Sequence, residues 1–75
     1  MVSILKNYVR GPIIDGLSEG YKKELNLLLK SAENYGLMWE VLQYFQTSVQ
    51  NNAITSESDI LWHLREACLE WDVNI

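Results

Sequence analysis

The chain has 75 residues, of which 48% are hydrophobic and 21% are charged, and its ten acidic and six basic side chains give a formal net charge of -4. This length fits one small domain over residues 1–75 and excludes most enzymes, which need more chain to enclose an active site. The negative charge opposes contact with phosphate backbones, so we do not expect direct binding to nucleic acid. A small core is marginally stable, and we therefore expect self-association as a homo-oligomer.

The acidic charge is concentrated in the second half of the chain. Residues 1–36 carry five basic and four acidic side chains, whereas residues 37–75 carry one basic and six acidic side chains. An acidic half either keeps a small protein in solution or attracts a basic partner, and the sequence leaves both interpretations open.

The amino-terminal region, residues 1–16, has no single hydrophobic period. Its apolar residues between Val2 and Val9 fit a short helix or an extended segment, and we prefer the helix. Gly11 and Pro12 are expected to end that segment. The apolar residues that follow are predicted to cross the core as an ordered connection, namely Ile13, Ile14 and Leu17.

A helix is predicted over residues 18–35. Ser18 is a favourable N-cap, and Glu19 lies in the first turn, where the helix dipole favours an acidic side chain. Gly36 is suited to the left-handed position that often follows a helix, so it separates this helix from the next one. The apolar residues recur at helical spacing and form one stripe, which comprises Tyr21, Leu25, Leu28, Ala32 and Tyr35.

Two further helices are predicted, over residues 37–50 and 56–71. Ser56 and Asp59 have the spacing of a capping box at the start of the last helix. The second stripe comprises Met38, Val41, Leu42, Phe45 and Val49. The third stripe comprises Ile60, Leu64, Ala67, Cys68 and Trp71, and the residues after it are expected to fray or to pack as a tail.

These elements predict an all-α fold. Three helices with short connections, preceded by a short amino-terminal helix or extended segment, form a compact three-helix bundle. The short connections fit either an up-and-down or an orthogonal arrangement of the helices, and the sequence does not choose between them.

No combination of residues encodes a reaction. The one histidine, His63, and the one cysteine, Cys68, are five residues apart, which places them on different sides of a helix. They form neither a nucleophile–base pair nor a zinc site, so we predict no catalytic residue, no metal site and no cofactor. Cys68 is expected to be a small core residue and His63 an ordinary surface residue.

Several large side chains lie off the predicted core stripes. Trp62 projects nearly opposite the centre of the third stripe, with Leu69 beside it two turns later, and Leu27 lies off the stripe of the first helix. On the second helix, Trp39 and Tyr44 flank the apolar face, where they either cover the amino-terminal segment or join an interface. Tryptophan and tyrosine are frequent at interface hot spots, which favours a partner-binding or self-association surface.

Charged residues of the last helix are predicted to form the rim of this surface. Glu66 and Glu70 are one turn apart near the helix end, where like charges oppose each other and the helix dipole. That cost either is tolerated or indicates that a positive group meets the cluster. The predicted interface residues are Trp62, Leu69, Trp39, Tyr44, Arg65, Glu66, Glu70 and Asp72.

Several short sequence motifs occur along one stretch of the chain, in a pattern that resembles known proteins. It includes Tyr35-Gly36-Leu37, then Glu40-Val41, and the ending Glu70-Trp71-Asp72 after a capped Thr-Ser-Glu-Ser helix start. Over residues 35–72 it resembles small uncharacterised helical accessory proteins of tailed phages, including T4-like phages of cyanobacteria. The resemblance implies a helical protein that acts by contact, and it transfers no catalytic residue.

Together these features predict a non-enzymatic protein–protein interaction module of the phage accessory type, which self-associates and binds or modulates a larger protein. The alternatives are a structural or assembly subunit, or an acidic mimic of nucleic acid that inhibits a DNA-binding enzyme. The start of the chain does not resemble a signal peptide, and no apolar run is long enough to span a membrane. We expect a soluble intracellular protein with no membrane contact, in the host cytoplasm if a phage encodes it.

Overall fold

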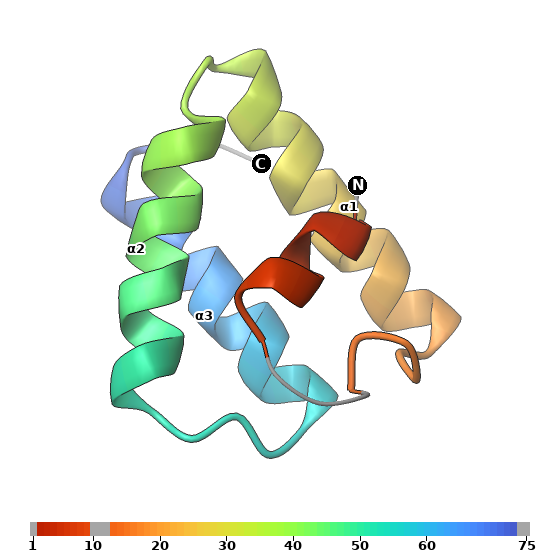
Figure 1. Ribbon diagram of the computed structural model, residues 1–75. Helices are drawn as coiled ribbons and strands as arrows, with labels where there is room; N and C mark the ends of the chain where they lie inside the picture. The colour runs from red at the N-terminus through yellow and green to blue at the C-terminus, as the bar shows by residue number, and fades with distance from the viewer. Residues whose placement is uncertain (1, 10–12, 74–75) are drawn as a thin grey trace.

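The computed structural model describes residues 2–9 and 13–73, and it confirms an all-α fold (Figure 1). Within these residues there is no β-strand. The elements in chain order are a 3-10 helix η1 (Val2–Asn7) and three α-helices, α1 (Glu19–Asn34), α2 (Met38–Asn51) and α3 (Glu57–Glu70). Each α-helix begins and ends within one residue of its predicted bounds, and the amino-terminal segment is helical, as preferred.

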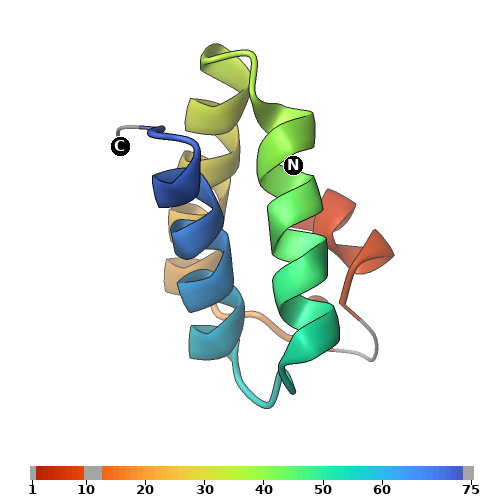
Figure 2. The same ribbon diagram turned by 90° about the vertical axis from the view of Figure 1, so that its left-hand side faces the viewer.

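The three α-helices form an up-down-up bundle. Figures 1 and 2 show α1 and α3 running in the same direction, with α2 antiparallel to both. A hydrogen bond between Ser18, at the start of α1, and Glu57, at the start of α3, supports the parallel direction of these two helices. Helix α3 packs against both other helices, which contact each other less extensively. The orthogonal alternative is therefore excluded.

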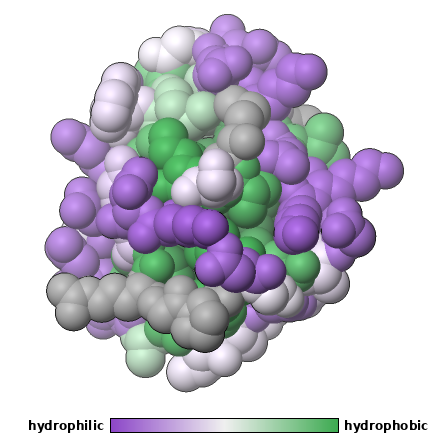
Figure 3. Space-filling model, turned by 45° about the vertical axis from the view of Figure 1, so that its right-hand side comes forward, coloured by the Kyte–Doolittle hydropathy of each residue, from purple (hydrophilic) through white to green (hydrophobic). Residues whose placement is uncertain are grey.

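Helix η1 lies in front of the space between α1 and α2 in Figure 1, and it packs against α1. The Val2 N–H donates to Oδ1 of Asn26 in α1 at 3.1 Å. Just beyond η1, Tyr8 reaches α2, where its ring meets that of Phe45 edge to face with centroids 6.4 Å apart. The amino-terminal segment thus bridges the two helices. Figure 3 shows apolar surface emerging between hydrophilic side chains on one face of the molecule.

Residues 13–17, which precede α1, contribute to the core, as predicted. Ile14 and Leu17 are buried, and Ile13 packs against the core from a partly buried position. Asp15 between them pairs with Lys6 of η1 at 2.5 Å. The predicted break at Gly11 and Pro12 lies outside the described residues.

Gly36 ends α1 in the left-handed conformation that was predicted for it, with φ of 71°. The N–H of Leu37 donates to the Ala32 carbonyl at 2.9 Å, and the Gly36 N–H donates to the Glu33 carbonyl at 3.0 Å. These two bonds form a Schellman motif, which satisfies carbonyls that the helix end would otherwise leave unpaired.

Helix α3 ends in the same way, which overturns one core prediction. Asp72 takes the left-handed position with φ of 55°, and the N–H of Val73 donates to the Cys68 carbonyl at 2.9 Å. This reversal carries Val73 into the core, where it is 1% exposed, while Trp71 remains 43% exposed. The prediction that Trp71 belongs to the buried stripe is wrong, because the helix ends at Glu70 and its periodicity no longer applies.

The core contains residues from η1, α1, α2 and α3, from the segment just before α1, and Val73 just after α3. The predicted stripes are largely confirmed, although Tyr35, at the end of α1, is exposed. Its position beyond the last helical residue explains the error, as for Trp71. The buried residues are Leu5, Val9, Ile14, Leu17, Leu25, Leu28, Leu29, Ala32, Val41, Leu42, Phe45, Ile60, Leu64, Ala67, Cys68 and Val73.

None of the helices in residues 2–9 and 13–73 is both long and apolar enough to cross a membrane.

Candidate functional site

Trp62 and Leu69 are exposed on the outer side of α3, as their positions on the helix predicted. Their side chains are 58% and 59% exposed. Seven residues of separation put them on the same side of the helix, about 10 Å apart along its axis. These two large apolar side chains, which we call the α3 strip, are therefore exposed on one side of α3, with Arg65 and Glu66 between them in the chain.

The ion pair between Arg65 and Glu24 joins this strip to α1. Arg65 lies one turn after Trp62, and its guanidinium is 3.9 Å from the Glu24 carboxylate on α1. On α1, Leu27 is three residues beyond Glu24 and is 49% exposed. The outer side of the two parallel helices thus carries Leu27, Trp62 and Leu69 around a central ion pair. We call this surface, with Glu24 and Arg65, the α1–α3 face.

The predicted acidic rim is divided between two places. Glu66 is partly buried one turn beyond Trp62, close to the α1–α3 face. Glu70 and Asp72 are exposed at the carboxyl-terminal end of α3. The last turn of α3 contains no basic residue, so the negative end of the helix dipole adds to these carboxylates. The predicted rim residues therefore lie partly beside the α1–α3 face and partly at one end of the bundle.

The two candidate residues on α2 lie apart from the α1–α3 face. Tyr44 is partly buried and packs against the core. Trp39 is 70% exposed in the first turn of α2. It borders a pocket of about 370 Å³ together with Ile4 of η1, Glu33 of α1 and Met38 of α2. The structure thus does not bring the predicted interface residues together on one surface.

The pocket at Trp39 was not predicted from sequence, because three different elements build it. Ile4 comes from η1, Glu33 from the last turn of α1, and Met38, Trp39 and Leu42 from α2. Leu42 is buried and closes the inner wall, whereas Glu33 is exposed at the edge. Trp39 was noted for lying off the core face, and that position was the one available signal.

Among residues 2–9 and 13–73, no group of three or more histidine, cysteine, aspartate or glutamate side chains is placed to hold a metal ion. Cys68 is buried, and burial raises the pKa of its thiol to about 11. Its Sγ is 3.9 Å from the Leu28 carbonyl oxygen of α1. Since the thiolate is the nucleophilic form, this cysteine is poorly suited to nucleophilic chemistry and serves packing.

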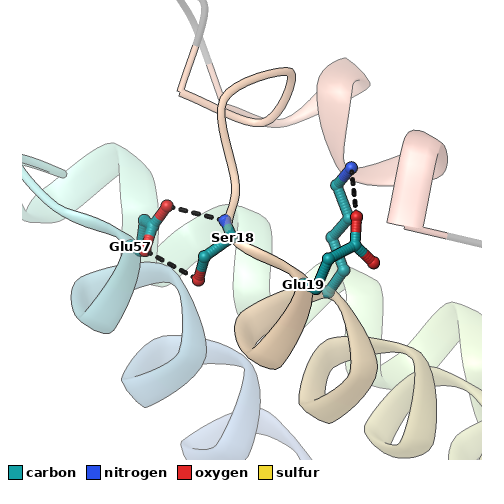
Figure 4. Close-up of polar contacts among 4 residues, drawn as sticks. Ser18, Glu19 and Glu57 are labelled. Carbon is teal, nitrogen blue, oxygen red and sulfur yellow. Dashed lines mark hydrogen bonds and ion pairs between the residues drawn. The ribbon is translucent and has the colours of Figure 1, made fainter.

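At the end of the bundle opposite Glu70 and Asp72, a polar cluster connects the starts of α1 and α3 (Figure 4). The Ser18 N–H donates to Oε1 of Glu57 at 2.9 Å, and the Ser18 hydroxyl donates to Oε2 at 3.3 Å. Ser18 is therefore the N-cap residue of α1, as predicted, but its hydroxyl binds Glu57 instead of an α1 N–H. The Glu57 carboxylate lies at the positive ends of both α1 and α3.

The capping box predicted for α3 is present in altered form. The Ser56 hydroxyl accepts the Asp59 N–H at 3.4 Å, as expected of an N-cap. The Asp59 carboxylate reaches one residue further back and accepts the N–H and hydroxyl of Thr55, at 3.0 and 2.9 Å. These bonds, the backbone N–H of Thr55 first, lower the pKa of Asp59.

The chain was compared with known proteins by sequence and by structure. No protein-family model matches it, and neither a curated protein nor a solved structure does.

Proposed function

We propose that this chain is a non-enzymatic protein–protein interaction module of the phage accessory type, and that it pairs with a second copy of itself through the α1–α3 face. The observation that carries the proposal is the exposure of Trp62 and Leu69 two turns apart on one side of α3, with exposed Leu27 on α1, which the Glu24–Arg65 ion pair joins to α3. The paired molecule then binds or modulates a larger protein.

The composition of the face supports pairing between copies. Large apolar side chains on its two helices are available for burial, and covering one fully is worth about 1.5–3 kcal/mol. Glu24 and Arg65 supply one charge of each sign, so the ion pair itself adds no net charge to this face although the whole chain is acidic. In a twofold dimer the same patch occurs on both partners, which lets Arg65 of one copy approach an acidic group of the other.

The size of the molecule also agrees with a dimer. A stable interface of standard size covers about 800 Å² on each partner. The accessible surface of the chain is 4734 Å², so an interface of that size would cover about a sixth of it. Such burial adds to the modest core that a chain of 75 residues can form.

Sedimentation equilibrium over a dilution series tests the proposal. We expect the parent chain to reach the mass of a dimer and the double variant Trp62→Ala/Leu69→Ala to remain monomeric with the same helical circular dichroism. Trp39→Ala is the matched control, since it removes an exposed tryptophan from a different surface and should leave the dimer intact.

A parent chain that stays monomeric at every concentration would refute self-association. Large ordered assemblies that survive the double substitution would instead favour the structural or assembly subunit. The acidic mimic of nucleic acid predicts binding to a DNA-binding enzyme that weakens steeply as salt is added.

A further inference from the structure

We propose that the pocket beside Trp39 binds an arginine side chain from a basic segment of a partner protein. The inference deepens the proposed function by naming a site and a chemistry for the larger partner. It uses a surface separate from the α1–α3 face, so it does not depend on self-association.

The walls of the pocket suit the stem of a long side chain. Ile4, Met38 and Leu42 supply apolar contact, and the indole of Trp39 forms an exposed edge. The volume of about 370 Å³ is near the lower limit of small-molecule pockets, which accommodates one side chain better than a larger ligand. The pocket lies at the surface between η1, the end of α1 and the start of α2, where an extended segment has access.

The charge around the pocket selects a cation. Glu33 is the one charged side chain among the described residues that line it. Glu33 lies in the last turn of α1, which contains no basic residue, so the negative end of the helix dipole adds to the carboxylate. The start of α2 contributes an opposite partial charge, and Glu40 in that first turn offsets it. Among the described ion pairs, none involves Glu33 or Glu40.

Tryptophan beside a carboxylate favours arginine over other side chains. A cation over an indole face is attracted by the ring quadrupole, and tryptophan is the strongest of the aromatic partners. The planar guanidinium can stack on the indole while its N–H groups donate to a carboxylate, which the compact lysine ammonium does less well. An acidic or purely apolar segment would leave the Glu33 carboxylate without a counter-charge.

Titration calorimetry of the full chain with a short blocked peptide of alternating arginine and glycine, at low salt, tests this inference. The matched probe is the same peptide with citrulline, which keeps the shape of arginine but has no charge. We expect the arginine peptide to bind and the citrulline peptide to bind at least tenfold more weakly. In a two-dimensional NMR spectrum, the arginine peptide should shift the indole N–H signal of Trp39 and leave that of Trp62 unmoved.

Two substitutions examine the pocket itself. Trp39→Leu keeps an apolar side chain and should weaken binding by about threefold to tenfold through loss of the cation–π contact. Glu33→Gln should weaken it by about twofold to fivefold. Trp62→Leu and Glu70→Gln are the matched controls, because they make the same changes elsewhere and should leave the affinity unchanged.

Absence of binding by the arginine peptide would overturn the inference, as would equal affinity for the citrulline peptide. An equal loss of affinity in Glu70→Gln and Glu33→Gln would also overturn it, because it would show attraction by overall charge rather than by the pocket. Since Trp39 and Glu33 are exposed, both variants should retain the parent unfolding temperature, which separates a binding effect from misfolding.

Discussion

The two ends of the bundle are built on opposite principles. At one end, the starts of α1 and α3 lie together, and Glu57 accepts two hydrogen bonds from Ser18. At the other end, the two helices finish in left-handed turns at Gly36 and Asp72, with no basic residue in either last turn. The first end satisfies its polar groups internally. The second leaves negative charge and large aromatic side chains at the surface, which is why we place the proposed arginine pocket there.

This contrast follows from the up-down-up topology. Parallel α1 and α3 bring two positive dipole ends together at one end and two negative ends at the other. The carboxylates of Glu19, Glu57 and Asp59 lie in the first turns at the positive ends, and Glu57 also joins α3 to α1 through Ser18. At the negative ends the exposed aromatic residues are Tyr35 and Trp71, which directly follow α1 and α3, and Trp39 in the first turn of α2. We expect the exposed aromatic side chains of the second, aromatic end to matter for binding of the basic segment and to contribute little to stability.

The largest expected effect concerns Val73, which is the part of the aromatic end that serves folding. Val73→Ala should lower the free energy of unfolding by about 2 kcal/mol, because it removes buried methyl groups from a packed site. The much larger change Trp39→Ala, at the same end, should alter it by less than about 0.5 kcal/mol. Urea denaturation followed by circular dichroism measures both. A greater loss in Trp39→Ala would mean that the exposed aromatic side chains hold the fold together.

Glu57 provides the corresponding test at the polar end. Glu57→Ala should cost about 1 kcal/mol in the free energy of unfolding, because the N–H and hydroxyl of Ser18 lose a charged acceptor. Glu57→Gln should cost less, since its amide oxygen can still accept one of the two bonds. The control is Glu19→Ala, which removes another first-turn acid whose recorded partner is Lys22 at 3.6 Å. Equal losses at positions 19 and 57 would show that the dipole, and not the bridge between helices, is the source of the effect.

A smaller effect, of opposite sign, is expected at Asp72. This residue has a left-handed backbone, with φ of 55°, which glycine adopts without steric cost. Asp72→Gly should therefore raise the free energy of unfolding by about 0.5–1 kcal/mol in thermal or urea denaturation. Asp72→Ala is the informative partner, because it removes the same charge but keeps the Cβ atom. If alanine stabilises as much as glycine, then relief of charge repulsion, and not backbone strain, is responsible.

The free energy of unfolding should also depend on pH through Asp59 at the polar end. Hydrogen bonds from Thr55 lower its pKa in the folded chain below the ordinary value for an aspartate. Its contribution to stability is therefore complete above the pKa of the unfolded chain, and it is lost as the pH falls through the lower folded pKa. The stability difference between the parent and Asp59→Ala should shrink between about pH 5 and about pH 2 in urea denaturation. A difference that stays constant over this range would refute the role of the Asp59 carboxylate.

Local patterns in the sequence were sufficient for the helices and for the outward position of their exposed residues. Apolar spacing placed all three α-helices, because an amphipathic helix repeats its buried face every three to four residues. Gly36 marked the end of α1, because few other residues adopt positive φ without cost. The exposure of Trp62 and Leu69 followed from the same geometry, since a position opposite the core face has nothing of its own chain to cover it.

The tertiary structure decided which residues meet across elements. Val73 is buried in place of Trp71 because of where the chain reverses after α3. The Ser18–Glu57 hydrogen bonds form because α1 and α3 run parallel. The pocket at Trp39 needs Ile4 of η1, which lies far from it in the chain, and Glu33, which lies on the other side of the turn between α1 and α2. Helical periodicity is a property of neighbouring residues, so the sequence by itself determines which way a side chain points. What that side chain meets depends on the packing of distant segments, and for this protein that packing produced the pocket.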